Sequence, residues 1–179
     1  MRPILIIPVL SILFSSGSHA DTSQADFLAQ NGLKGKSVEQ MVDTIDQTPQ
    51  SRPLPYKASV TSKSLILTAD QKTYEYPLGD KFYLSFSPWQ SQTHPCENHS
   101  LSGCTGEMPN TQFDVKITNS DGAVVVQQPM QSYQNGFIGV WLPREMKGTI
   151  EVSYKGKRAT APVNIFTDSP TCMTTLKLI

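Results

Sequence analysis

The sequence predicts an α+β fold that is mainly β: a small N-terminal helix-plus-strand unit followed by an antiparallel β-sandwich. Three observations favour this class. A helical period is confined to the segment just after residue 20, a period of two runs through the rest, and turn dipeptides separate the alternating runs. We expect a signal peptide over residues 1–20, the helix-plus-strand unit over 21–78, and the sandwich over 79–179, which also carries the cysteines discussed below.

Residues 1–20 have the pattern of a cleavable export signal. Arg2 supplies the positive start, residues 4–14 are largely apolar, and Ser18 and Ala20 place small side chains where a signal peptidase reads them. The apolar run is shorter than the roughly 20 residues that a membrane span needs. We therefore expect export to the periplasm, with no membrane association after signal removal.

The charges of the chain are balanced, with 15 basic and 15 acidic residues and no basic run. Nucleic acid is therefore not expected as a partner. After signal removal the chain is long enough to bury roughly two-thirds of its surface on folding. Its cysteines are not required merely to compensate for a small core.

Two helices are predicted at the start of the mature chain. Ser23 with Asp26 three residues later is a capping-box pattern, and Gly32 is typical of a helix end. A second box, Ser37 with Gln40, opens the second helix. The apolar face of that helix has the spacing i, i+3, i+4, i+7 and comprises Val38, Met41, Val42 and Ile45.

Alternating apolar residues predict the strands. They fall at residues 56–60, 64–68, 74–76, 82–86, 113–117, 150–154 and 159–165. Asp121-Gly122, Asn135-Gly136 and Lys155-Gly156 are turn signals between the later runs. Because Pro162 cannot donate to a ladder, we expect the last strand at a sheet edge or a bulge. A lone hairpin is marginal in water, so the N-terminal strands should dock on the sandwich or complete their sheet in a homodimer.

Residues 87–112 have no hydrophobic period and are rich in Pro, Gly, Ser, Thr and Asn. Such long loops are uncommon unless they are functional or disordered. This one contains Cys96 and Cys104. The third cysteine, Cys172, follows the last long strand by a few residues and reaches the loop if that strand ends at the same end of the sandwich.

Two interpretations of the cysteines remain open at the level of residues. One disulfide with a spare thiol leaves a residue unexplained, and a ring closed by Cys96 and Cys104 would contribute only about 2 to 3 kcal/mol. A metal site uses all three cysteines. Three thiolates suit Cu(I), whereas adding His99 gives a Cys3His set that also suits zinc. The spacing does not separate the two ions.

Other donors lie close to these residues in the sequence. His99 stands between Cys96 and Cys104 and is the fourth candidate ligand. Three further side chains have donor atoms suited to copper but are not assigned a role, namely His94, Met108 and Met173. There is no Cys-x-x-Cys pair and no flavin or nicotinamide fingerprint, so neither a thioredoxin-like site nor a redox cofactor is indicated.

The motif Cys96-x-x-His99-x-x-x-x-Cys104-x-Gly106-Glu107, with Cys172-x-Thr174-Thr175 near the C-terminus, resembles the CueP family of periplasmic copper-binding proteins. The resemblance extends over the mature chain and implies copper rather than zinc. It also implies a role in copper resistance, with Cu(I) held by the three cysteines and passed to cuproenzymes such as a Cu,Zn superoxide dismutase. Reduction of Cu(II) or Fe(III) is a further activity that the resemblance suggests.

Three classes of function follow. The leading hypothesis is a Cu(I)-binding metallochaperone that takes one ion per chain through Cys96, Cys104 and Cys172, with His99 beside them. The second is a thiol-dependent Cu(II)/Fe(III) reductase in which two thiols close to a disulfide; the sequence does not decide whether the protein is an enzyme. The third is a disulfide-stapled structural or interaction domain.

Overall fold

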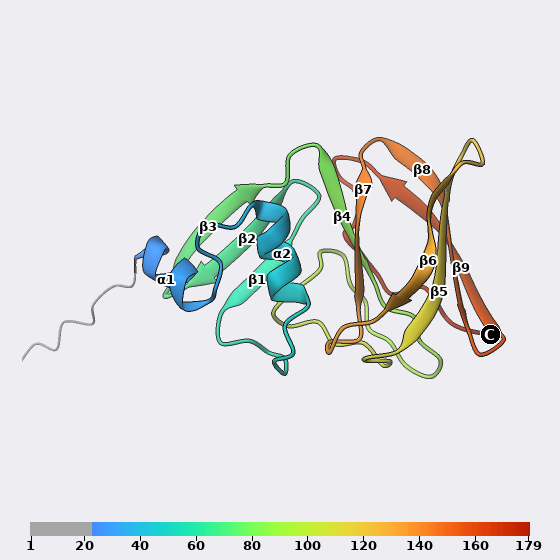
Figure 1. Cartoon of the computed structure of the whole chain (residues 1–179), viewed down its shortest axis with the longest axis horizontal. Helices are drawn as coiled ribbons and strands as arrows, with labels where there is room; N and C mark the ends of the chain where they lie inside the picture. Colours follow the sequence, from blue (N-terminus) through green and yellow to red (C-terminus); the bar gives the residue numbers. More distant parts are fainter. Residues whose placement is uncertain (1–22) are drawn as a thin grey trace, which may run out of the picture.

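The computed structural model describes residues 23–179, which form two helices and three β-sheets (Figure 1). The predicted signal peptide lies outside the described residues. Within residues 23–179, no helix is long and apolar enough to cross a membrane. The fold is α+β and mainly β, as the sequence predicts.

Both helices begin at the predicted caps. Helix α1 spans Gln24–Gln30, and the Ser23 hydroxyl accepts a hydrogen bond from the Asp26 amide. Helix α2 spans Val38–Asp46 and starts with a complete capping box between Ser37 and Gln40. Such a box satisfies two amides that the first turn of a helix leaves without partners.

The first sheet is an antiparallel meander beside the helices. Its order is β1 (Lys57–Val60), β2 (Ser64–Ala69) and β3 (Lys72–Pro77). One face of this sheet and the apolar face of α2 share a core that we call the N-terminal cluster (Figure 1). The fully or nearly fully buried members of this cluster include Val42, Ile45, Val60, Leu65 and Leu67.

The remaining strands form a sandwich of two sheets. One sheet has the order β10 (Cys172–Met173), β4 (Lys81–Phe86), β7 (Ile138–Pro143). The other has the order β6 (Val124–Gln131), β5 (Gln112–Asn119), β8 (Met146–Tyr154), β9 (Lys157–Ile165). Strand β9 lies at a sheet edge, as Pro162 requires. Strand β10 pairs in parallel with β4, an exception to the otherwise antiparallel pairing.

The sheet that contains β4 has an apolar core on both of its faces. Phe82, Leu84 and Phe86 point into the sandwich core, while Tyr83 points into the N-terminal cluster. Across the strand pair, Trp141 of β7 also packs on that cluster, with its ring centroid 4.8 Å from that of Tyr83. The two cores are therefore separated by a single layer of backbone.

Three strands were not expected from the sequence. Strand β6 is mostly exposed and contains Pro129, so it shows little hydrophobic alternation. Strand β10 has only two residues, too few for a period. Strand β7 does alternate through Ile138, Val140 and Leu142, which are buried, so its sequence carries a period of two.

Candidate metal centre

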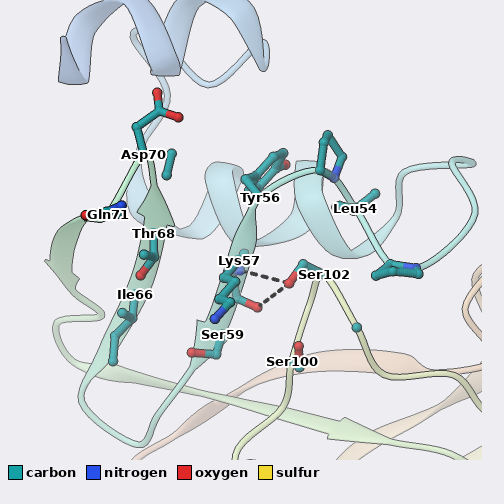
Figure 2. A pocket seen from close by; sticks show the side chains of 15 residues that line it. Leu54, Tyr56, Lys57, Ser59, Ile66, Thr68, Asp70, Gln71, Ser100 and Ser102 are labelled. Atoms are coloured by element: carbon teal, nitrogen blue, oxygen red, sulfur yellow. Dashed lines mark hydrogen bonds between the residues drawn. The ribbon is translucent and has the colours of Figure 1, made fainter. Parts of the chain in front are cut away.

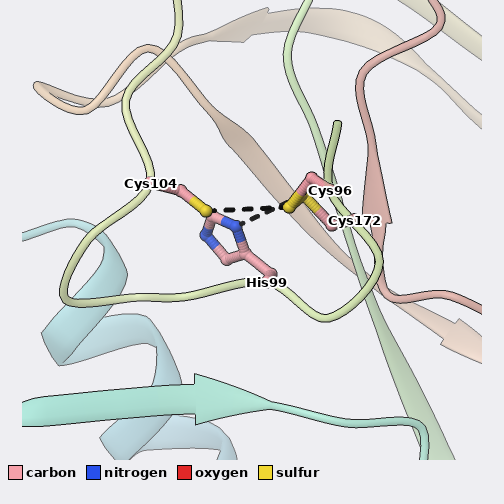
Figure 3. Close-up of side chains that lie close together, drawn as sticks. All are labelled: Cys96, His99, Cys104 and Cys172. Carbon is pink, nitrogen blue, oxygen red and sulfur yellow. Dashed lines mark hydrogen bonds between the residues drawn. A yellow bond between two sulfur atoms is a disulfide. The ribbon is translucent and has the colours of Figure 1, made fainter. Parts of the chain in front are cut away.

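The three cysteines and His99 lie together at one end of the sandwich (Figure 3). Cys96, His99 and Cys104 come from the loop between β4 and β5, and Cys172 comes from β10. Their ligand atoms all lie within 4.8 Å of one another. The expectation that Cys172 reaches the loop is correct, because β10 runs alongside β4 at the point where the loop leaves it.

The loop is fixed to the edge of β1. The Val60 amide donates to the His99 carbonyl at 2.9 Å. The Ser102 hydroxyl accepts from the Ala58 amide at 2.9 Å, and Figure 2 shows this second contact. Between them, Leu101 is fully buried in the N-terminal cluster. The loop thus covers a strand edge that would otherwise be open for pairing.

A hollow of about 780 Å³ lies beside this part of the loop, over β1 and β2 (Figure 2). Its lining includes Tyr56, Lys57, Ile66 and Ser100 but none of the clustered cysteines or His99. The soft donor atoms are therefore not in this hollow, and we do not assign the chemistry to it.

Arg52 joins the loop to the end of α2. Its guanidinium donates to the Leu101 carbonyl at 2.7 Å and to the carbonyls of Ile45 and Asp46 at 3.1 Å each. A cation at these carbonyls complements the partial negative charge at a helix C-terminus. The position of the loop and the position of the last turn of α2 are therefore coupled.

Cys96 and Cys172 form a disulfide, and Cys104 is a free thiol. This differs from the expectation of three free thiols and also from the small ring considered between Cys96 and Cys104. Cys172 meets Cys96 because the Thr171 and Cys172 amides both donate to the carbonyl of Glu97. The Cys104 sulfur lies 3.6 Å from the Cys96 sulfur. The form with three thiolates therefore requires reduction of this disulfide.

His99 is fully buried, and its Nε2 lies 2.9 Å from Oδ1 of Asp46, which is also fully buried. Burial alone would lower the pKa of His99, but the charge and hydrogen bond of Asp46 outweigh it and raise that pKa to about 9. Burial likewise opposes ionisation of Asp46, yet the charge of His99 and hydrogen bonds from His99, Tyr83 and Asn135 lower its pKa. The pair is ionised at neutral pH.

The free thiol of Cys104 is electrostatically activated. Burial would raise its pKa, but hydrogen bonding and the charge of His99, followed by a hydrogen bond from His94, lower it to about 7. A substantial fraction of Cys104 is therefore thiolate at neutral pH, the form that binds metals.

The structure gives the remaining candidate donors different surroundings. His94 is half-buried and helps to lower the pKa of Cys104, and its ring centroid lies 6.1 Å from that of Phe137. Met108 and Met173 both pack against the sandwich core. Neither methionine is thereby assigned to the metal centre.

Asp46 is the part of the site that the sequence interpretation missed. It lies four residues after Val42 on the buried face of α2, and a carboxylate at that position was a signal that could have been followed. Nothing in the sequence placed Tyr83 and Asn135 beside it, because these residues converge only through the sheet pairing and the turn after β6.

A mainly β protein that gathers three cysteine sulfurs and an imidazole defines a candidate soft-metal-binding protein. The family described as periplasmic copper-binding protein CueP matches residues 40–177. The chain therefore belongs to the CueP family, as the motif suggested. The solved crystal structure of S.CueP has 64% sequence identity and a TM-score of 0.86; the match covers 89% of this chain and 99% of that one. Among curated proteins, none matches the sequence.

Proposed function

We propose that the reduced protein binds one Cu(I) ion through the thiolates of Cys96, Cys104 and Cys172 with His99, holds it in the periplasm and passes it to cuproenzymes such as a Cu,Zn superoxide dismutase. The observation that carries this proposal is the convergence of the four ligand atoms within 4.8 Å. Soft thiolate sulfur selects Cu(I), and imidazole is also a good copper ligand.

The disulfide adds a redox requirement to this proposal. Thiol–disulfide exchange with a dithiol reductant, which is itself oxidised to a disulfide, supplies the two electrons and two protons that convert the Cys96–Cys172 bond to two thiols. Binding of Cu(I) then releases the thiol protons. The backbone already holds all three cysteines together in the oxidised form, so little rearrangement is needed after reduction. A Cys3His set also fits zinc, which makes zinc the ion to exclude.

Transfer of the ion needs ligands that a partner can reach. Cys96 and Cys104 are partly exposed, whereas Cys172 and His99 are buried. We infer that an acceptor exchanges ligands from the side of Cys96 and Cys104, while the buried pair releases the ion last. The predicted homodimer is a separate proposal, which light scattering of the mature protein would check.

An anaerobic Cu(I) titration of the reduced protein against a chromophoric chelator tests the proposal. We expect about one tightly bound Cu(I) per chain, and Cys172→Ser should weaken binding by orders of magnitude, because it removes one of three thiolates. Met173→Leu is the matched control next to it, since it leaves all three sulfur ligands in place. Far-UV circular dichroism of both variants checks the fold.

The outcomes separate a three-thiolate copper site from a structural staple and from a zinc site. Parent-like Cu(I) binding by Cys172→Ser would rule out the three-thiolate site. Failure of the reduced parent to compete with the chelator would make the disulfide a structural staple, and displacement of Cu(I) by equimolar zinc would make zinc the preferred ion.

The disulfide favours one second candidate function, reduction of Cu(II) by the thiols. Two Cu(II) ions would accept one electron each as Cys96 and Cys172 lose two protons and form their bond, giving two Cu(I). We expect a burst of about two Cu(I) per chain that stops when the disulfide has closed. Sustained turnover with an added thiol reductant would instead indicate a catalyst.

A further inference from the structure

Asp46 carries a buried charge that the folding of α2 does not explain. It is the last residue of that helix, with no exposed surface. Burying a carboxylate is costly unless it is paired and hydrogen-bonded. Three buried donors reach it: Nε2 of His99 and Nδ2 of Asn135 to Oδ1 at 2.9 and 2.7 Å, and the Tyr83 hydroxyl to Oδ2 at 2.7 Å.

We propose that Asp46 is the positioning residue of the metal centre, and that its hydrogen bond to Nε2 of His99 directs Nδ1 of that ring at the copper ion. This inference rests on the proposed Cu(I) site and assigns the histidine nitrogen that binds and the residue that selects it.

The geometry of the imidazole supports this assignment. With Nε2 directed at Asp46, the other ring nitrogen, Nδ1, lies 3.9 Å from the Cys172 sulfur and faces the sulfur cluster (Figure 3). A histidine that binds a metal through one nitrogen commonly donates its other N–H to a carboxylate, which fixes both the tautomer and the ring orientation. Asp46 is placed to accept that N–H.

The surroundings of His99 fix the position of its imidazole ring and leave open mainly a flip that exchanges the two ring nitrogens. The His99 amide donates to the Thr171 hydroxyl at 3.0 Å, and its carbonyl accepts from the Val60 amide. The ring centroid lies 4.6 Å from that of Phe137. With backbone and ring face both held, the bond to Asp46 selects which nitrogen faces the sulfurs.

The hydrogen bond from Asn135 to Asp46 has a defined direction. The Asn135 side-chain oxygen accepts from the Phe137 amide at 3.0 Å, so its nitrogen is the end that donates to Asp46. The carboxylate belongs to α2, whereas Cys172 belongs to the sandwich. Helix α2 therefore orients a ligand of a site whose sulfurs lie on the β4–β5 loop and on β10.

Asp46→Asn tests the proposal, since it is nearly isosteric and removes the carboxylate. The matched control is Asp43→Asn on the same helix, because Asp43 accepts from the Trp141 indole at 3.0 Å and has no contact with His99. Reduced parent and variants are titrated with Cu(I) alone against the chromophoric chelator, without oxygen. We expect Asp46→Asn to weaken Cu(I) binding about 10- to 100-fold, and Asp43→Asn to bind like the parent.

A double-mutant cycle with His99→Ala separates positioning from a structural role. If Asp46 acts through His99, then Asp46→Asn causes no further loss of Cu(I) affinity in the His99→Ala background. An equal loss in both backgrounds, or parent-like affinity of Asp46→Asn, would overturn the assignment. In either case loss of binding in Cys172→Ser would still leave the three-thiolate site standing, whereas a parent that binds no Cu(I) overturns both.

A measurement on the unaltered protein keeps the test independent of how well Asp46→Asn folds. In ¹⁵N NMR spectra of the Cu(I)-loaded parent, His99 should show Nδ1 bound to the metal and Nε2 still protonated. Metal bound at Nε2, or an unbound His99, would contradict the proposal whatever the variant does.

Discussion

At the scale of residues, His99 stands between a carboxylate and a thiol. Its charge is balanced on one side by Asp46 and on the other by Cys104. An imidazolium beside the thiol favours its ionised form, and Arg52 adds a second positive charge that interacts with both Asp46 and Cys104. His99 thus serves the chemistry of the site before any metal arrives.

Alkylation of Cys104 in the oxidised protein should report this charge. The pKa of Cys104 is lowered from 9.0 to about 7, so its thiolate fraction, and with it the rate of reaction with iodoacetamide, should rise through about pH 7. In His99→Gln the midpoint should move up toward 9. Mass spectrometry of the labelled peptide confirms that Cys104 is the residue modified. A profile unchanged by His99→Gln would show that another group activates the thiol.

The sequence predicted the members of the cysteine cluster but not how they are joined or supported. Cys96, His99 and Cys104 lie within nine residues, and their donor chemistry is visible in the sequence. Asp46 is 53 positions away from its partner His99. The pairing of Cys96 with Cys172 depends on the short parallel strand β10, which two residues cannot signal.

At the scale of elements, the cysteine loop is held in place by close backbone contacts. A Cβ on Gly106 would meet the carbonyl oxygen of Gly136 at 2.6 Å and would overlap the Ser87 hydroxyl. The Gly106 amide also donates to the Asn135 carbonyl at 2.6 Å. Only glycine lets the loop approach the turn after β6 this closely.

Gly106→Ala should therefore displace the loop and lower the free energy of unfolding by about 1–3 kcal/mol, the usual cost of overpacking. Gly103→Ala is the control in the same loop, since its Cβ meets only the movable Ser100 hydroxyl at 3.0 Å. The free energy of unfolding of Gly103→Ala should lie within about 0.5 kcal/mol of that of the parent. Urea denaturation of the oxidised proteins measures both, and equal stabilities would contradict the tight approach at Gly106.

The elements with strong local signals were predicted closely. The predicted caps at Ser23 and Ser37 locate the helix starts, and the alternation in β5, β8 and β9 matches their burial. Strand β4 is buried on both faces, so its role as the layer between two cores was not visible in a period of two. The division of the chain at residue 78 stays a prediction.

At the scale of the whole molecule, the two cores should unfold together. Tyr83 and Trp141 pack on the N-terminal cluster from strands whose other face builds the sandwich core. A defect in one core therefore weakens the layer on which the other depends. We expect a single thermal transition reported alike by far-UV circular dichroism and tryptophan fluorescence.

Leu67→Ala tests this coupling from the N-terminal side. Leu67 is fully buried in β2, and its truncation should cost about 2–5 kcal/mol. Thr68→Ala, the next residue on the same strand, is half-buried on the other side of the sheet and should cost less than about 1 kcal/mol. The Leu67→Ala transition should stay single and move to lower temperature. Two separated transitions would show that the cores are independent.

The Cys96–Cys172 bond bridges a sequence separation of 76 residues. In the chain-entropy model, opening so long a ring costs about 4 to 5 kcal/mol of stability. The reduced, empty protein should then be the form most exposed to proteases, and it is also the form that we propose receives copper. Binding of the ion to the folded state restores the loss by mass action. Copper supply would thereby determine how long each reduced molecule survives, so that the amount of receptor follows the amount of its cargo.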